Sequence, residues 1–284
     1  KQLKLAGEGS KLYLVYFYFA FTGLLWSYIV ILFLFGATES NATDGLFVER
    51  LSWSGAHGRV LIVSDISGCI KELQHLIKSS SYRPEKDSLI FIGDMVGEGP
   101  ASAQVVQFAM DHDAECIRGP VEDKIVSWYL TEDENTLTNA PEREIAKNLK
   151  DDQLQYLLAC SLDVELQEHN TRIIHSGLNP QGDLHNQREE LLLKLGQESG
   201  KITNRVTSWF DDWNGPELIV FGGGQHTNVQ QKHSNNQLTA LGLATGVAQG
   251  QTLSALALPD TQILQVPSKA NYSGQKHPEE LMGE

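Results

Sequence analysis

Short apolar segments alternate with segments of helical spacing from residue 59 onward. Residues 59–63, 88–92 and 114–118 are short and rich in apolar side chains, which predicts buried strands. Residues 70–77 and 101–110 repeat apolar side chains every three or four positions, which predicts helices between those strands. This order is typical of a parallel sheet built from strand–helix–strand units, in which ligands gather at the carboxyl ends of the strands.

The second half of the chain predicts more helices and then a run of strands. A hairpin is predicted over residues 161–175, with its second strand ending at His175. Further helices are predicted at 121–130, 141–149, 153–160, 191–195 and 208–213, and further strands at 218–221, 238–243, 252–258 and 261–266. We therefore expect one α/β domain over residues 58–266, followed by a polar C-terminal tail at 267–284.

The longest apolar run, residues 12–38, contains no charged side chain. At about 1.5 Å per residue, a helix of this length exceeds the roughly 30 Å hydrocarbon core of a bilayer, which predicts an uncleaved, single-pass transmembrane anchor. A buried core helix and a cleaved signal peptide are the alternatives. Lysines gather in the tail 1–11 and acidic residues in the linker 39–57. This asymmetry predicts a tail on the cytosolic or matrix-like side and a domain on the lumenal or intermembrane side. It does not identify the organelle.

The net charge of the domain limits the classes of partner that it can bind. The formal net charge is −14, and the tail 1–11 holds three lysines and one glutamate, so the remaining residues sum to −16. A domain this acidic repels nucleic acid and anionic lipid surfaces, which argues against both as its partners.

Cysteines and glycosylation sequons bear on the compartment. Cys69, Cys116 and Cys160 are odd in number and lack metal-type spacing, so we expect buried thiols. Asn41 and Asn271 each begin an Asn-X-Ser/Thr sequon, which fits a secretory lumen but also arises often by chance.

Five short segments at the ends of predicted strands carry the candidate chemistry. They are Ser64-Asp65-Ile66-Ser67-Gly68, Gly93-Asp94-Met95-Val96-Gly97-Glu98-Gly99-Pro100, Arg118-Gly119-Pro120-Val121-Glu122, His175-Ser176-Gly177 and Phe221-Gly222-Gly223. In order and spacing they resemble the GDxHG, GDxxDRGP, GNH(E/D), H(A/S)G and GH motifs of the calcineurin-like metallophosphoesterases. The stretch 241–246 also resembles the family's GLDTG, with Ala244 in place of the acid.

The resemblance covers roughly residues 58–266. The chain is most similar to phosphoprotein phosphatases, diadenosine tetraphosphatases and fungal vacuolar polyphosphatases. The resemblance implies a sandwich of two mixed β-sheets flanked by helices, preceded here by the predicted transmembrane helix.

Family chemistry uses two metal ions, bridged by an aspartate and a hydroxide, to attack phosphorus in line. The resemblance assigns Asp65 to the first metal, Asp94 to the bridge and His175 to the second metal. The remaining positions are changed: Ser67 replaces a histidine ligand, Glu98 the phosphate-binding arginine, Pro120 an asparagine ligand, Val121 the general-acid histidine and Gly223 the fifth motif's histidine. These side chains supply no imidazole, amide or guanidinium group, although His226, three residues past Gly223, is an alternative ligand.

These changes predict a pseudoenzyme without a metal cofactor, in which a protonated His175 lies between Asp65 and Asp94. We expect an accessory subunit of a larger membrane protein complex, with the anchor contacting lipid and other subunits. The alternatives are a weakly active phosphoesterase that uses one remaining metal, and a phosphate or nucleotide sensor.

Overall fold

The computed structural model describes residues 51–53, 58–194, 208–224 and 227–273. These residues belong to a compact unit that spans Val48–Glu284. Among them, no helix is both long enough and apolar enough to cross a bilayer. The predicted anchor at 12–38, the sequon at Asn41 and the alternative ligand His226 lie outside the described residues.

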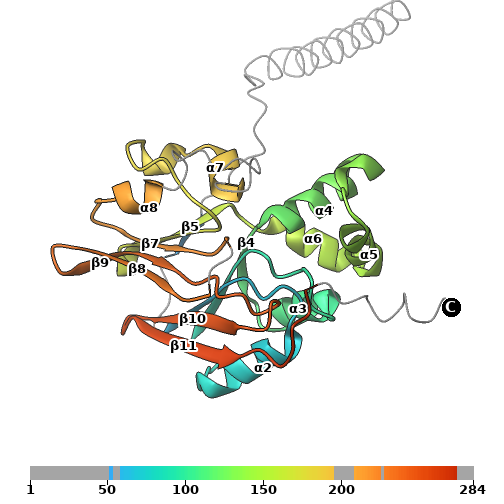
Figure 1. Cartoon of the computed structure of the whole chain (residues 1–284), viewed down its shortest axis with the longest axis horizontal. Helices are drawn as coiled ribbons and strands as arrows, with labels where there is room; N and C mark the ends of the chain where they lie inside the picture. Colours follow the sequence, from blue (N-terminus) through green and yellow to red (C-terminus); the bar gives the residue numbers. More distant parts are fainter. Residues whose placement is uncertain (1–50, 54–57, 195–207, 225–226, 274–284) are drawn as a thin grey trace, which may run out of the picture. The chain divides into compact units, whose positions relative to one another are not determined.

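The strands form two mixed sheets, as the sequence predicts (Figure 1). The five-stranded sheet has the order β11-β10-β2-β3-β4, in which β2, β3 and β4 are parallel and β10 is antiparallel to both β2 and β11. Its strands are β2 (Val60–Val63), β3 (Ser88–Ile92), β4 (Glu115–Ile117), β10 (Thr252–Leu258) and β11 (Gln262–Pro267).

The six-stranded sheet has the order β1-β5-β6-β7-β9-β8. Here β6, β7 and β9 are parallel, β5 is antiparallel to β6, and β8 is antiparallel to β9. Its strands are β1 (Leu51–Trp53), β5 (Asp163–Leu166), β6 (Thr171–Ile174), β7 (Leu218–Phe221), β8 (Gln230–Ser234) and β9 (Gln237–Gly242).

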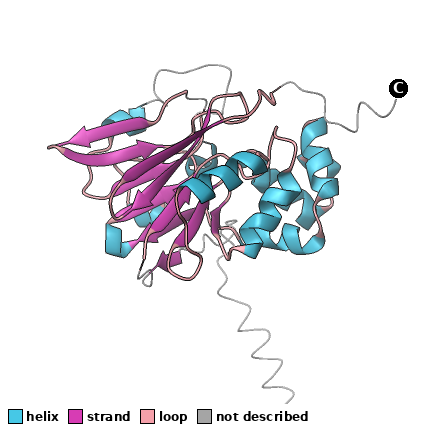
Figure 2. Ribbon diagram, turned by 90° about the horizontal axis from the view of Figure 1, so that it is seen from below, coloured by secondary structure: helices cyan, strands magenta, loops and turns pink. Residues whose placement is uncertain are grey.

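Helices flank the two sheets, and Figure 2 shows the strands at the left and centre with a large group of helices at the right. The α-helices are α2 (Ile70–Ser79), α3 (Ser102–Asp111), α4 (Pro120–Thr131), α5 (Ala140–Asn148), α6 (Asp151–Ala159), α7 (Glu189–Lys194) and α8 (Ser208–Asp212). Short 3-10 turns lie at η1 (Glu134–Thr136), η2 (Gln167–His169) and η3 (Leu184–Asn186).

The side chains of β2 explain why its sequence is continuously apolar. Val60 and Ile62 join the core between the two sheets, where they are grouped with residues of β6, β7 and β9. Leu61 and Val63 point the other way, into the core shared with α2 and α3. Because both faces of the strand are covered, alternation between polar and apolar residues is absent.

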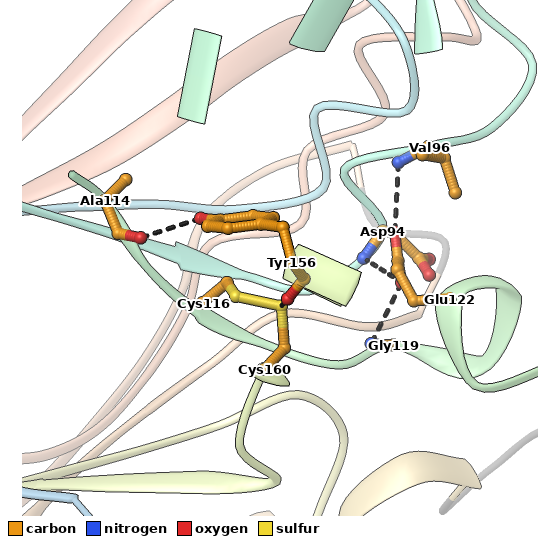
Figure 3. The surroundings of a disulfide bond; sticks show 8 residues. All are labelled: Asp94, Val96, Ala114, Cys116, Gly119, Glu122, Tyr156 and Cys160. Atoms are coloured by element: carbon orange, nitrogen blue, oxygen red, sulfur yellow. Dashed lines mark hydrogen bonds between the residues drawn. A yellow bond between two sulfur atoms is a disulfide. The ribbon is translucent and has the colours of Figure 1, made fainter. Parts of the chain in front are cut away.

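The expectation of three buried thiols is wrong for two of them. Cys116 in β4 and Cys160 after α6 form a disulfide, with their Cα atoms 4.9 Å apart (Figure 3). Their 44-residue separation hides this proximity in the sequence. The amide of Ser161 donates to the Cys116 carbonyl at 3.0 Å, and this backbone bond brings the two cysteines together. Cys69 is buried and free, as expected.

Two strands and one ordered segment lie where none was predicted. β1 falls inside the predicted linker, and β8 alternates half-buried and exposed side chains at the sheet edge. After β11 the chain folds back onto α2, where Glu72 Oε1 accepts hydrogen bonds from the Lys269 amide at 2.9 Å and the Tyr272 hydroxyl at 3.0 Å. The first residues of the predicted tail are therefore part of the domain.

Candidate functional site

The surviving candidate residues meet where the parallel strands of both sheets end. Asp65 follows β2, Asp94 follows β3, His175 follows β6, and Gly223 follows β7. The Gly223 amide donates to Asp65 Oδ1 at 3.2 Å, and His175 Nε2 lies 3.9 Å from Asp94 Oδ1. A Cβ atom on Gly223 would lie 3.4 Å from His175 Nε2. The structure thus gathers the first, second, fourth and fifth motifs at one site, as the sequence predicts.

The backbone at this site is held in an uncommon conformation. Asp65, Ser67 and Asp94 have φ values of 44°, 50° and 44°, in the left-handed region that side-chain-bearing residues rarely adopt. The Ser67 amide donates to the Asp94 carbonyl at 2.6 Å, and the Gly99 amide donates to the Ser67 carbonyl at 2.6 Å. Such conformations cost about 1–3 kcal/mol each and often occur at functional sites, which agrees with the position of these residues in the first and second motifs.

Two glycines allow the backbone to pass close to the aspartates. A Cβ atom on Gly119 would lie 2.5 Å from Asp94 Oδ1, and one on Gly222 would lie 2.4 Å from Asp65 Oδ1. Both distances are far shorter than a van der Waals contact. Any larger residue at either position would displace a carboxylate of the site.

The half-buried Asp94 and the buried His175 form a pair that lacks a direct hydrogen bond. His175 Nδ1 lies 2.8 Å from the Ile92 carbonyl, so this nitrogen carries the proton and donates it. Asp94 Oδ1 and His175 Nε2 are both buried and have no hydrogen-bond partner among the described residues. A proton, a cation or a bridging water would satisfy two facing acceptors of this kind.

The surroundings of this pair raise the pKa of both of its members. Burial raises the pKa of Asp94, His175 opposes that shift, and Asp65 and Glu122 reinforce it. Burial lowers the pKa of His175, but Asp94 and Asp65 outweigh burial, so the pKa of His175 is raised overall. These pKa shifts agree with the predicted Asp–His–Asp cluster, in which His175 is protonated. The protonation state itself stays a prediction.

Glu122 is a residue of the site to which the sequence analysis assigned no role. It is fully buried, and its carboxylate accepts hydrogen bonds from the amides of Asp94 at 3.1 Å, Val96 at 3.0 Å and Gly119 at 3.0 Å (Figure 3). These bonds join the loop after β3 to the start of α4. In the sequence, the signal for this role was that Glu122 is the acidic residue at the end of the third motif.

The substituted positions have ordinary local environments. Pro120 is the first residue of α4, where its fixed φ is favourable. The half-buried Val121 packs against the core shared with α2 and α3. Glu98 is exposed, and its Oε2 accepts from Gln249 Nε2 at 3.1 Å. Ser67 is half-buried and Gly223 is buried. Pro120, Val121 and Gly223 offer no side-chain ligand, the Ser67 hydroxyl is a weak one, and Glu98 carries the wrong charge for a phosphate.

These donors do not fit a binuclear metal centre. The unpartnered atoms of Asp94 and His175, with Asp65 nearby, are of the type that holds one cation. Divided between two cations, these side chains would give each cation only one ligand besides the shared Asp94, because the first, third and fifth motifs have lost theirs. Over the part of the chain that the structure describes, no group of three or more His, Cys, Asp or Glu side chains is arranged to hold a metal ion.

Comparison with known proteins establishes the family. Residues 58–246 match the model of the calcineurin-like phosphoesterases. The chain belongs to this family. Membership confirms the resemblance drawn from the five motifs and the sandwich of two mixed sheets.

Relatives within the family carry the names of nucleotide-hydrolysing enzymes. The chain is 30% identical over 197 residues to a symmetrical bis(5'-nucleosyl)-tetraphosphatase of Shewanella sediminis, covering 62% of this chain and 69% of that protein. It is 25% identical over 244 residues to an asymmetrical one of Anoxybacillus flavithermus, covering 76% and 96%. A crystal structure provisionally assigned as a diadenosine tetraphosphatase superposes with a TM-score of 0.67 at 26% identity, covering 78% of this chain and 99% of that one.

Proposed function

We propose that this family member does not hydrolyse phosphoesters by the two-metal route. The observation that carries the proposal is the start of α4, where Pro120 and Val121 stand in place of a metal ligand and a general acid. A pyrrolidine ring cannot coordinate a cation, and an isopropyl group cannot donate a proton to a leaving oxygen. Loss of one such group commonly costs about a hundred-fold in rate, so the combined loss abolishes efficient turnover.

We propose that the chain binds other proteins instead of hydrolysing phosphoesters. The apolar run at 12–38 would anchor the chain in a membrane, and the domain would dock onto other subunits as an accessory part of a membrane complex. A well-packed core in the described residues, combined with a degenerate site, supports this proposal, because one fold can serve unrelated functions.

The comparisons favour a second candidate, because the relatives named above are enzymes. In that candidate the chain is a weakly active, metal-dependent phosphoesterase that acts on a nucleoside polyphosphate. The observation in its favour is that Asp94 Oδ1 and His175 Nε2 face each other without a hydrogen-bond partner in the described part of the chain, an arrangement that one cation would satisfy. A non-hydrolysing phosphate sensor has less support, since the Glu98 carboxylate repels phosphate where the family has an arginine.

A hydrolysis assay separates these candidates. The purified full chain is stripped with chelator, supplied with Mn²⁺, and incubated with diadenosine tetraphosphate or a generic phosphomonoester. We expect no turnover above that of an Asp94→Ala variant, because the acid and the second cation's ligands are absent. Turnover that requires Mn²⁺ and disappears in Asp94→Ala would establish the second candidate instead.

A restored variant supplies the positive control. It carries Ser67→His, Glu98→Arg, Pro120→Asn, Val121→His and Gly223→His together. If the remaining scaffold is competent, this variant gains Mn²⁺-dependent turnover while the wild-type chain stays inactive. Circular dichroism and thermal unfolding report whether it has folded, because a Cβ atom on Gly223 would lie 2.9 Å from the His175 carbonyl.

A further inference from the structure

We propose that Asn271 is a site of N-linked glycosylation in a secretory lumen. The site lies in the segment that follows β11 and contacts α2 through Glu72. The inference rests on a lumenal placement of the domain, one of the two that the sequence predicts, and is independent of whether the chain hydrolyses phosphoesters.

The structure presents the Asn271-Tyr272-Ser273 sequon at the surface in an ordered turn. Asn271 is exposed, whereas Tyr272 is half-buried and bonds α2 through its hydroxyl. The Tyr272 amide donates to the Ala248 carbonyl at 2.7 Å, which fixes the middle of the sequon against the domain. The exposed Asn271 thus lies in a stretch of backbone that is anchored to the domain.

The hydroxyl that defines the sequon is bonded to the acceptor asparagine. Ser273 Oγ donates to Asn271 Oδ1 at 2.7 Å, and the Ser273 amide donates to the same oxygen at 3.0 Å. These bonds hold the carboxamide with its oxygen toward Ser273. The base of the side chain packs on the turn at Gly250, where a Cβ atom would lie 3.3 Å from Asn271 Cβ.

The disulfide supplies an independent argument for the compartment. Cys116 and Cys160 are 5% and 3% exposed, and their bond lies inside the core beside β4. Structural disulfides form and persist in oxidising compartments, including the lumen of the endoplasmic reticulum, and are rare in the cytosol. The same lumen holds the machinery that modifies exposed Asn-X-Ser/Thr sequons.

Modification requires a co-reactant of defined class, a lipid-pyrophosphate-linked oligosaccharide. The Asn271 Nδ2 atom forms a bond to the anomeric carbon of the sugar and loses one proton. The bond from that carbon to the pyrophosphate oxygen breaks, and the lipid pyrophosphate leaves with the bonding electron pair. No oxidant or reductant takes part.

The test expresses the full chain in eukaryotic cells that have an active secretory pathway. All variants carry Asn41→Gln, so that the other sequon does not contribute. We expect one glycosidase-sensitive increase in mass, which disappears with Asn271→Gln or Ser273→Ala and returns with Ser273→Thr. Enzymatic deglycosylation converts the modified asparagine to aspartate, and peptide mass spectrometry should find that conversion at residue 271.

Alkylation of free thiols in the same samples separates the ways in which the inference can fail. A chain with the Cys116–Cys160 bond formed but no glycan would be in another oxidising space, such as an intermembrane space, or would have an unused sequon. A chain whose cysteines are all alkylated and that lacks a glycan would lie in a reducing compartment. Either result overturns the proposal.

Discussion

The Oδ1 atom of Asp94 lies 3.9 Å from the Nε2 atom of His175, and neither atom has a hydrogen-bond partner within the described residues. The fold therefore maintains a carboxylate with one buried oxygen, and its surroundings only partly compensate the charge of that carboxylate. Burial, Asp65 and Glu122 all disfavour that charge and raise the pKa of Asp94. Unfavourable charges of this type at functional sites commonly lower the stability of a protein.

Replacement of Asp94 by asparagine should therefore stabilise the chain in the presence of a chelator. Asparagine keeps the shape of the side chain and removes the unfavourable charge. We expect a gain of about 1 kcal/mol, which corresponds to a rise of roughly 2–4 °C in the midpoint of thermal unfolding. Asp260→Asn, at an exposed turn, is the matched control and should change little. A lower midpoint for Asp94→Asn would show that ionised Asp94 is well compensated by His175.

Loss of the Glu122 carboxylate should be strongly destabilising. Glu122→Ala leaves the amides of Asp94, Val96 and Gly119 without their acceptor, and each buried, unpaired amide costs about 1–3 kcal/mol. We expect a loss of at least about 3 kcal/mol in the free energy of unfolding, measured by urea denaturation. Glu85→Ala, at an exposed position, should lie within about 0.5 kcal/mol of wild type. Equal effects of the two substitutions would contradict the role assigned to Glu122.

Removal of the disulfide should lower stability by about 3–4 kcal/mol. The bond closes a loop of 44 residues, and the entropy lost by the unfolded chain on closing a loop of this size corresponds to that range. The variant Cys116→Ala/Cys160→Ala tests this by denaturant unfolding with and without a reducing agent. Wild type should lose stability on reduction, and the variant should not respond. An identical response in both proteins would mean that the bond does not form in solution.

A buried carboxylate far from the candidate site should make stability depend on pH. Burial raises the pKa of Asp87, but hydrogen bonds from Arg83 and Arg59 outweigh burial and hold the pKa well below its usual range. A lowered pKa in the folded state gives stability that is present above about pH 4 and is lost as the pH falls through the folded-state value. Because the Arg83 side chain is 53% exposed, most of this stability comes from Arg59 and the backbone bonds.

Asp87→Asn should therefore cost about 2 kcal/mol at pH 7, and this difference should shrink steadily below pH 4. Denaturant unfolding of both proteins at several pH values measures it. A difference that stays constant down to pH 2 would mean that the charge of Asp87 contributes nothing. A difference that grows on acidification would reverse the sign assigned to the shift.

The sequence predicted the strand ends that build the site, because those strands are short and apolar with both faces covered. The prediction of residues 88–92 matches β3, and 59–63 differs from β2 by one residue. Local periodicity cannot reveal polar edge strands. β8 has no apolar stripe, and only the Asn235-Asn236 turn, where both residues have positive φ, marked it as one arm of a hairpin.

Motif spacing located Asp65, Asp94 and His175 but could not supply their partners. The disulfide depends on a backbone bridge between Ser161 and β4, which is a tertiary contact with no local signature. The three amides that Glu122 accepts also come from different segments of the chain, so its role is visible only in the fold. Comparison with family motifs therefore finds the residues that contact a ligand. It finds less easily the residues, such as Glu122, that hold the surrounding backbone in place.

The contact between Glu72 and the segment after β11 bears on how the protein should be handled. Glu72 is 1% exposed, and its only described donors are the Lys269 amide and the Tyr272 hydroxyl. A chain shortened at Pro267 would leave this acid inside the protein without either donor. Affinity tags and fluorescent fusions should therefore be joined after Ser273, and boundaries chosen from the polarity of the sequence alone would yield a weakened protein.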